Sequence, residues 1–204
     1  MYKGVHDDLN RMVVAQLDAP ESQGKFQQTG YFEKYILCSR CDNEVIGKME
    51  RYMALLLFGG QSSTPPKFER AVGSDGIKSI LITNIDYNKL KLCILSILWG
   101  AHISLNKFFK NVDIQNNSER IRRMIIENDA NDESEYKIAI VGMRNAEGMI
   151  RMVADPSVVK MGEGCMAMFF INGFFYFIDL IPSSGFALFQ KHFLTKSGRY
   201  DIMI

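Results

Sequence analysis

The sequence predicts an α+β fold with a two-cysteine knuckle followed by a helix, a buried central helix and a C-terminal antiparallel sheet. Three patterns lead to this prediction: Cys38 and Cys41 just ahead of an amphipathic stretch, a strongly apolar stretch with helical spacing in mid-chain, and short apolar segments separated by turn residues in the last third. They divide the chain into an incomplete knuckle-and-helix segment, residues 1–60, and an α+β segment, residues 61–204.

The composition is that of a globular protein. Of the 204 residues, 47% are hydrophobic and 23% charged, and the formal net charge is +1, which excludes a disordered chain and a strongly basic nucleic-acid-binding protein. Four cysteines are too few for a disulfide-stapled secreted domain, and the polar, acidic N-terminus does not resemble a signal peptide. We therefore expect a cytoplasmic protein in a reducing compartment, with no membrane association.

The N-terminal segment predicts a strand over 12–17, a polar turn, and an extended piece over 31–37 that leads to the cysteine pair. Apolar residues then recur at helical spacing over 43–58, and Gly59-Gly60 provides a helix stop.

The middle of the chain predicts two strands and three helices. The strands are expected over 68–72 and 77–82, and Asp86 is expected to cap a helix that runs to about Ile103. This helix is apolar on nearly every side, so it should be buried. The other helices are expected over 105–109 and over 118–127, the latter with Ile121, Met124 and Ile125 inward.

The last third predicts strands over 136–141, 149–153, 158–161, 166–171, 174–178 and 199–203. The longest apolar stretch, residues 165–181, has Asn172-Gly173 at its centre, and this pair favours a β-hairpin over a membrane span. The many aromatic residues around that turn fit the two faces of a hairpin, although stacking on nucleic-acid bases is the alternative. An uncovered aromatic face would favour self-association.

Cys38 and Cys41 are separated by two residues, a spacing that lets two thiolates bind one tetrahedral zinc ion. The pair is half of a structural site, because Cys93 and Cys165 lie in apolar stretches and the histidines are scattered. A thioredoxin-like dithiol and a chance pairing of two thiols are the alternatives.

Residues 31–60 read YFEKYILCSRCDNEVIGKMERYMALLLFGG. The segment resembles the closing half of the zinc-stabilised ββα-metal fold of HNH endonucleases, and most of all a group of uncharacterised bacterial HNH-like proteins with a Leu-Cys-x-x-Cys-Asp-Asn turn. Residues 95–99, Leu-Ser-Ile-Leu-Trp, are similar to the same group, so the resemblance extends over most of the chain. In that family an opening half supplies another cysteine pair and a His general base, and a divalent ion holds the scissile phosphate.

This chain shows neither that cysteine pair nor that His. The resemblance implies that Asp42, which follows the second cysteine, is a ligand for Mg²⁺ or Mn²⁺, whereas Val45 replaces a customary basic residue. His6, beside Asp7 and Asp8, is interpreted as a surface residue rather than a base or fourth zinc ligand. We therefore expect a catalytically incomplete member, which either starts at an internal Met of a longer frame or is a natural short form.

Basic side chains suggest where a nucleic acid would bind. Those singled out are Arg40, Lys48, Arg120, Arg122 and Arg123. They would contact phosphates in a salt-sensitive way, and the alternative is a solvated helix face whose charges acidic neighbours compensate.

The sequence therefore predicts an HNH-like, nucleic-acid-associated protein with zinc at its cysteine pair, in phage defence or a toxin system. The competing hypothesis is a non-catalytic component without a nucleic-acid role that binds a protein partner or forms a homo-oligomer through its aromatic sheet.

Overall fold

The structure is a computed structural model that describes residues 5–16, 24–31, 36–60, 64–73, 76, 78–146, 148–182 and 184–204. Its helical elements are η1 (Cys41–Ile46), α1 (Gly47–Phe58), α2 (Tyr87–Ile103), η2 (Lys107–Phe109), α3 (Asn117–Glu127) and η3 (Ser184–His192). Its strands are β1 (Met12–Ala15), β2 (Lys25–Gln27), β3 (Lys67–Val72), β4 (Lys78–Thr83), β5 (Ile138–Gly142), β6 (Arg144–Asn145), β7 (Gly148–Met149), β8 (Met152–Met161), β9 (Gly164–Ile171), β10 (Phe174–Ile181) and β11 (Arg199–Met203).

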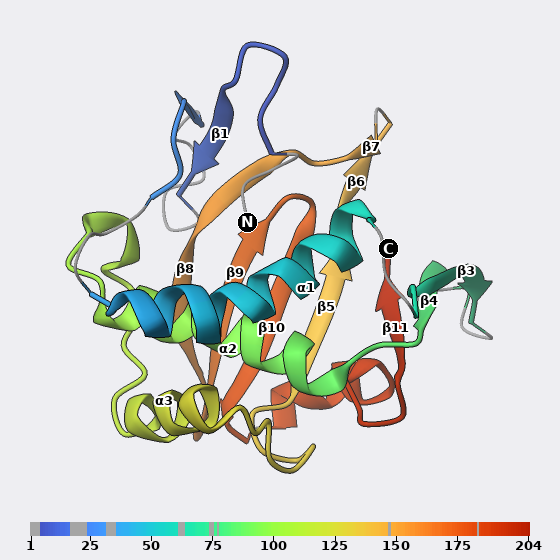
Figure 1. Cartoon of the computed structure of the whole chain (residues 1–204). Coiled ribbons are helices and arrows are strands. Elements are labelled where there is room, and N and C mark those ends of the chain that lie inside the picture. Colours follow the sequence, from blue (N-terminus) through green and yellow to red (C-terminus); the bar gives the residue numbers. More distant parts are fainter. Residues whose placement is uncertain are drawn as a thin grey trace.

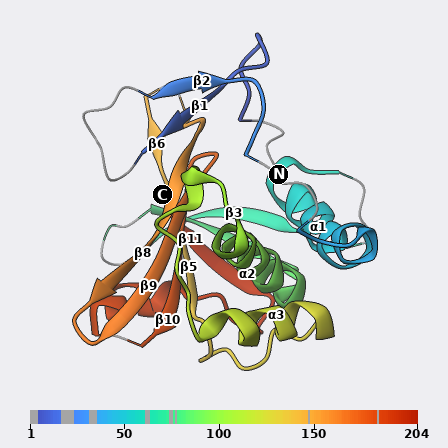
Figure 2. The same cartoon turned by 90° about the vertical axis from the view of Figure 1, so that its left-hand side faces the viewer.

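The described strands form one nine-stranded sheet and a small β6–β7 ribbon. The strand order of the large sheet is β2-β1-β8-β9-β10-β5-β11-β4-β3. The stretch from β8 to β5 is antiparallel, which confirms the α+β class with a C-terminal antiparallel sheet, whereas β1 pairs with β8 and β11 with β5 in parallel. The three α-helices lie on one face, and α2 lies between the sheet and α1 (Figures 1 and 2).

The central helix forms for the reasons that the sequence indicates. The Asp86 carboxylate accepts a hydrogen bond of 3.0 Å from the Lys89 backbone N–H, so Asp86 caps α2 as expected. Leu90, Leu92 and Ile94 are fully buried, because α2 is apolar on nearly every side and lies between the sheet and α1 (Figure 2). Within the described residues, no helix combines the length and the apolar character needed to cross a membrane.

The hairpin at Asn172-Gly173 is also confirmed, since both residues have positive φ, 51° and 85°. On the helix side of the sheet Phe169 stacks on Tyr176 with ring centroids 4.8 Å apart. The aromatic side chains of β9 and β10 thus lie on two faces, as expected.

The aromatic face that points away from the helices is covered by η3, which is not among the elements expected from the sequence. Phe177 stacks on Phe189 with a centroid distance of 5.0 Å, and Phe186 stacks on Phe193 at 5.2 Å. Because the chain itself covers these rings, they offer little support for self-association through the sheet.

Two expected strands, 149–153 and 158–161, are wrong as separate elements. The single strand β8 replaces most of both, and its pairing with β9 shifts register between Ala154 and Ser157. Pro156 lies inside this irregularity, and a bulge accommodates a residue that has no backbone N–H to donate.

The boundary expected after residue 60 does not coincide with a break in the fold. β1 and β2 extend the sheet that the later strands form, and Met49 and Met53 of α1 belong to the same hydrophobic core as Ile94 and Ile178. The N-terminal segment is therefore built into the α+β unit.

Candidate metal centre

The cysteine pair lies at the start of the helical run that leads into α1. Helical structure begins at Ser39, and Cys38 directly precedes it. The Cys38 Sγ accepts a hydrogen bond of 3.4 Å from the Cys41 backbone N–H, and the Cys38 carbonyl accepts one of 3.0 Å from Asp42 N–H. The sulfur of Cys38 thus takes the place of a helix-capping oxygen, because the first N–H groups of a helix lack partners within it.

The turn after Cys38 is wider than an α-helical turn. In η1 the Gly47 N–H donates to the Asp42 carbonyl, five residues back, and the Asn43 side-chain amide donates to the Ser39 carbonyl at 2.9 Å. These contacts fix the backbone between the two cysteines and the first turn of α1.

The surroundings of the two thiols shift their pKa values in opposite directions. The Cys41 backbone N–H, followed by the Cys41 side chain, lowers the pKa of the exposed Cys38 thiol, and the Arg40 charge adds to this. The hydrogen bond with Cys38 raises the pKa of Cys41. A metal ion would bind the pair in its deprotonated form and displace the protons of both thiols.

A mostly apolar cavity of about 170 Å³ lies beside the pair. It is lined by both cysteines, by Trp99 of α2 and by Arg122 and Ile125 of α3. Three helical elements thus meet at the knuckle, which we define as residues 36–46.

The structure brings Cys38 and Cys41 together but not Asp42. Among the described residues, no group of three or more His, Cys, Asp or Glu side chains is placed to hold a metal ion. Asp42 instead lines a different cavity of about 400 Å³, together with Tyr31 and Phe108. The physical reason is helical geometry, since consecutive residues such as 41 and 42 do not face each other.

The other thiols and imidazoles lie outside this cluster. Cys93 is fully buried in α2, and burial raises its pKa to about 12. Cys165 is half-buried on β9, and His6 contacts the Gln28 carbonyl at 3.2 Å. The described part of the chain therefore offers the knuckle two sulfur ligands and nothing further.

The basic residues singled out from the sequence separate into two groups. Near the thiols, Arg40 has a side chain that is 84% exposed, and Arg122 lines the cavity beside the cysteines. Lys48 lies exposed at the start of α1, just after the knuckle. Arg122 also makes two hydrogen bonds to Glu119, at 2.8 and 2.7 Å.

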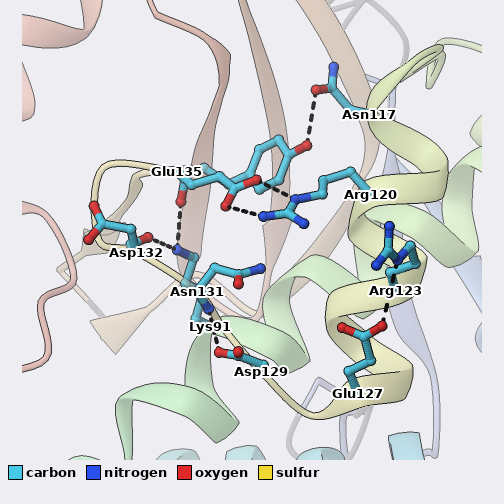
Figure 3. A network of polar contacts seen from close by, with 10 residues as sticks. Lys91, Asn117, Arg120, Arg123, Glu127, Asp129, Asn131, Asp132 and Glu135 are labelled. Atoms are coloured by element: carbon cyan, nitrogen blue, oxygen red, sulfur yellow. Dashed lines mark hydrogen bonds and ion pairs between the residues drawn. The ribbon is translucent and has the colours of Figure 1, made fainter.

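Arg120 and Arg123 lie in the polar network of Figure 3 rather than at the knuckle. Arg120 donates to both carboxylate oxygens of Glu135, at 2.8 and 3.1 Å, and Arg123 lies 3.6 Å from Glu127. These guanidinium groups are engaged with carboxylates, as Arg122 is with Glu119, and they differ from Arg122 in lying away from the cysteine pair.

The buried lysine of this network is not among the residues singled out from the sequence. Lys91 is 1% exposed, and its Nζ donates to the Tyr87 Oη at 3.0 Å and to the carbonyls of Asp132 and Glu135 at 2.9 and 2.5 Å. Burial lowers the pKa of Lys91 to about 8. The available signal was a lysine between Leu90 and Leu92 at the start of the apolar run of α2, and it marks a contact that ties α2 to the loop after α3 (Figure 3).

In comparisons with protein-family models, curated proteins and solved structures, no family model, protein or structure matches this chain.

Proposed function

We propose that this protein is an HNH-like, nucleic-acid-associated protein that binds zinc through Cys38 and Cys41 and lacks the machinery to cleave a phosphodiester. The observation that carries the proposal is the cysteine pair at the start of a helix, with Cys38 exposed, Cys41 half-buried, and Arg40 and Arg122 beside them. Reduced thiols suit a cytoplasmic protein, and all four cysteines are free.

The donor set fits zinc. Thiolates are preferred zinc ligands, and two of them on one turn can reach a single ion. The N–H of Cys41 and the charge of Arg40 lower the pKa of Cys38, whereas the hydrogen bond with Cys38 raises that of Cys41 despite the nearby charges of Arg40 and Arg122. Zinc would act structurally here, fixing the knuckle as a rigid unit.

The nucleic-acid part of the proposal rests on the basic side chains around the knuckle. Arg40, Lys48 and Arg122 come from adjoining helical elements, and Glu44 and Glu119 lie beside the two arginines. A phosphate would have to compete with these carboxylates, so we expect moderate affinity that falls steeply with salt.

Zinc content tests the first half of the proposal. Chain purified under reducing conditions should contain zinc by elemental analysis, and Cys38→Ser/Cys41→Ser should lose it. Cys165→Ser is the matched control because it removes a thiol outside the pair. Equal zinc in all three proteins, or none in the wild type, would overturn the zinc assignment.

Fluorescence anisotropy with labelled duplex and single-stranded oligonucleotides tests the second half. Arg40→Ala/Arg122→Ala should weaken binding and reduce the slope of log affinity against log salt by about one for each arginine. Arg70→Ala, an exposed arginine on β3, is the control. If wild type and both variants show the same slope of log affinity against log salt, nucleic acid does not bind at Arg40 and Arg122, and this half of the proposal is wrong.

Incubation with plasmid and Mg²⁺ or Mn²⁺ addresses catalysis. We expect no cleavage, because Asp42 alone cannot supply both a metal site and a general base. Cleavage that Asp42→Ala abolishes would refute the catalytic incompleteness.

A further inference from the structure

The cysteine pair supplies only two of the four ligands that a structural zinc ion needs. Structural zinc sites bind four protein ligands in a tetrahedron, and the described residues supply Cys38 and Cys41 with no third His, Cys, Asp or Glu nearby. Two ligands must come from elsewhere for the site to be closed.

The pair is open to a second molecule. Cys38 is exposed and Cys41 is half-buried, so both sulfurs lie at or near the protein surface. A second copy of this chain would present the same pair, and a two-fold axis through the ion would place four thiolates around it. Such a contact is self-complementary by symmetry, which is the most common arrangement in homodimers.

The surface around the pair suits a contact with a second copy. Ile36 and Ile126 line the cavity beside the cysteines and are 37% and 50% exposed, unlike most large apolar side chains of this protein. A second knuckle placed over the pair would bury these two isoleucines.

The charges are compatible with the same arrangement. A zinc ion with four thiolates has a net charge of −2, and each copy brings Arg40 and Arg122 close to its own thiols. Arg40 holds Glu44 only loosely, with 3.8 Å between Nε and Oε2, so these partners can exchange between copies. Charges of both signs at the rim would help to set the orientation.

We propose that one zinc ion joins two copies of this chain through the Cys38 and Cys41 thiolates of each. Four Zn–S bonds form as the ion gives up its water ligands, and the thiol protons leave to solvent. The inference rests on the zinc binding proposed above, and it names the partner as a second copy of this chain.

A zinc titration of the reduced, metal-free chain tests this directly. Light scattering coupled to size-exclusion chromatography should show the mass doubling as one zinc ion is added for every two chains, and a chelator should reverse it. Cobalt(II) in place of zinc should give the absorption of a tetrahedral four-thiolate site. Cys38→Ser/Cys41→Ser should stay monomeric, whereas Cys165→Ser should behave as the wild type.

Ile126→Glu tests the apolar contact between the two copies independently of zinc binding. It leaves both thiols in place, and we expect it to weaken dimerisation by at least tenfold at the same zinc concentration; circular dichroism checks its fold.

The outcomes distinguish the two proposals. No zinc binding at all would remove the proposed zinc function together with this inference. One zinc per chain in a monomer would keep the zinc function and overturn the dimer, and a dimer that persists with chelator or without the cysteines would also overturn it.

Discussion

Cys38 differs from the other three cysteines in both exposure and environment. It is exposed and its pKa is lowered, whereas burial raises the pKa of Cys93 and Cys165. Since the thiolate is the reactive form, reactivity at this position follows from the backbone N–H that Cys41 directs at the sulfur.

We expect iodoacetamide to modify Cys38 first, on the order of tenfold faster than Cys165, and Cys93 last. Peptide mapping by mass spectrometry at successive times measures this. Zinc should protect Cys38, and in urea the four rates should converge. Equal rates for Cys38 and Cys165 in the native protein would contradict the assignment.

Lys91 makes stability depend on pH with a definite sign. Its pKa is about 8 in the folded protein and returns to the ordinary 10.5 on unfolding, so the unfolded chain binds more protons in this window. The Lys91 contribution to the free energy of unfolding therefore rises as pH increases from about 8 towards 10.5.

Lys91→Met should remove this rise, because methionine does not titrate, while the Asp132 and Glu135 carbonyls lose their donor at every pH. Urea titrations from pH 7 to 10 compare it with wild type and with Lys48→Met, an exposed lysine on α1. The prediction fails if Lys91→Met and Lys48→Met have parallel pH profiles.

At the scale of elements, local signals decided what the sequence could predict. The Asp86 cap, the Gly59 stop and the Asn172-Gly173 turn act over a few residues, and each is found where expected. The parallel pairs β1–β8 and β5–β11 join distant segments, and no local pattern specifies them. For the site, spacing predicts the cysteine pair, but the separation of Asp42 depends on the helical backbone of η1.

Asp86→Ala should destabilise the protein by about 1 kcal/mol, because the Lys89 N–H loses its cap and the Lys89 ammonium loses a carboxylate at 2.6 Å. Glu163→Ala, an exposed acid in the turn between β8 and β9, is the control. Thermal unfolding followed by circular dichroism measures both, and an equal effect would refute the capping role.

Gly173→Ala should cost more than Gly162→Ala. Both positions have positive φ, 85° and 64°, so each alanine is strained by about 1 kcal/mol. At Gly173 a Cβ would also lie 2.7 Å from Cε of Met149, whereas nothing lies within 4 Å at Gly162. Urea unfolding of the two variants separates strain from steric clash, and equal losses would exclude the clash.

At the scale of the whole molecule, the knuckle packs against the rest of the fold. Its cavity includes side chains of α2 and α3, and α1 shares the core with the sheet. Metal binding at the cysteines should therefore stabilise the entire fold rather than one loop.

Zinc at 100 times its dissociation constant should add about 2.7 kcal/mol to the free energy of unfolding. The melting temperature of the wild type should rise with zinc and, if two chains share the ion, with protein concentration as well. Calorimetry at several concentrations checks this, with Cys38→Ser/Cys41→Ser as the insensitive control. A melting temperature independent of zinc would contradict it.

The two ends of the large sheet affect how copies of this protein can associate. Among the described strands, β2 has three residues, and the outer strand β3 exposes the charged Lys67, Glu69 and Arg70 alongside the apolar Phe68 and Val72. Short or charged edge strands disfavour pairing with another chain's backbone, the route to edge-to-edge aggregation and fibril growth. The short β2 and the charges of β3 thus oppose open-ended polymerisation at these edges, whereas the contact proposed at the knuckle is closed and finite.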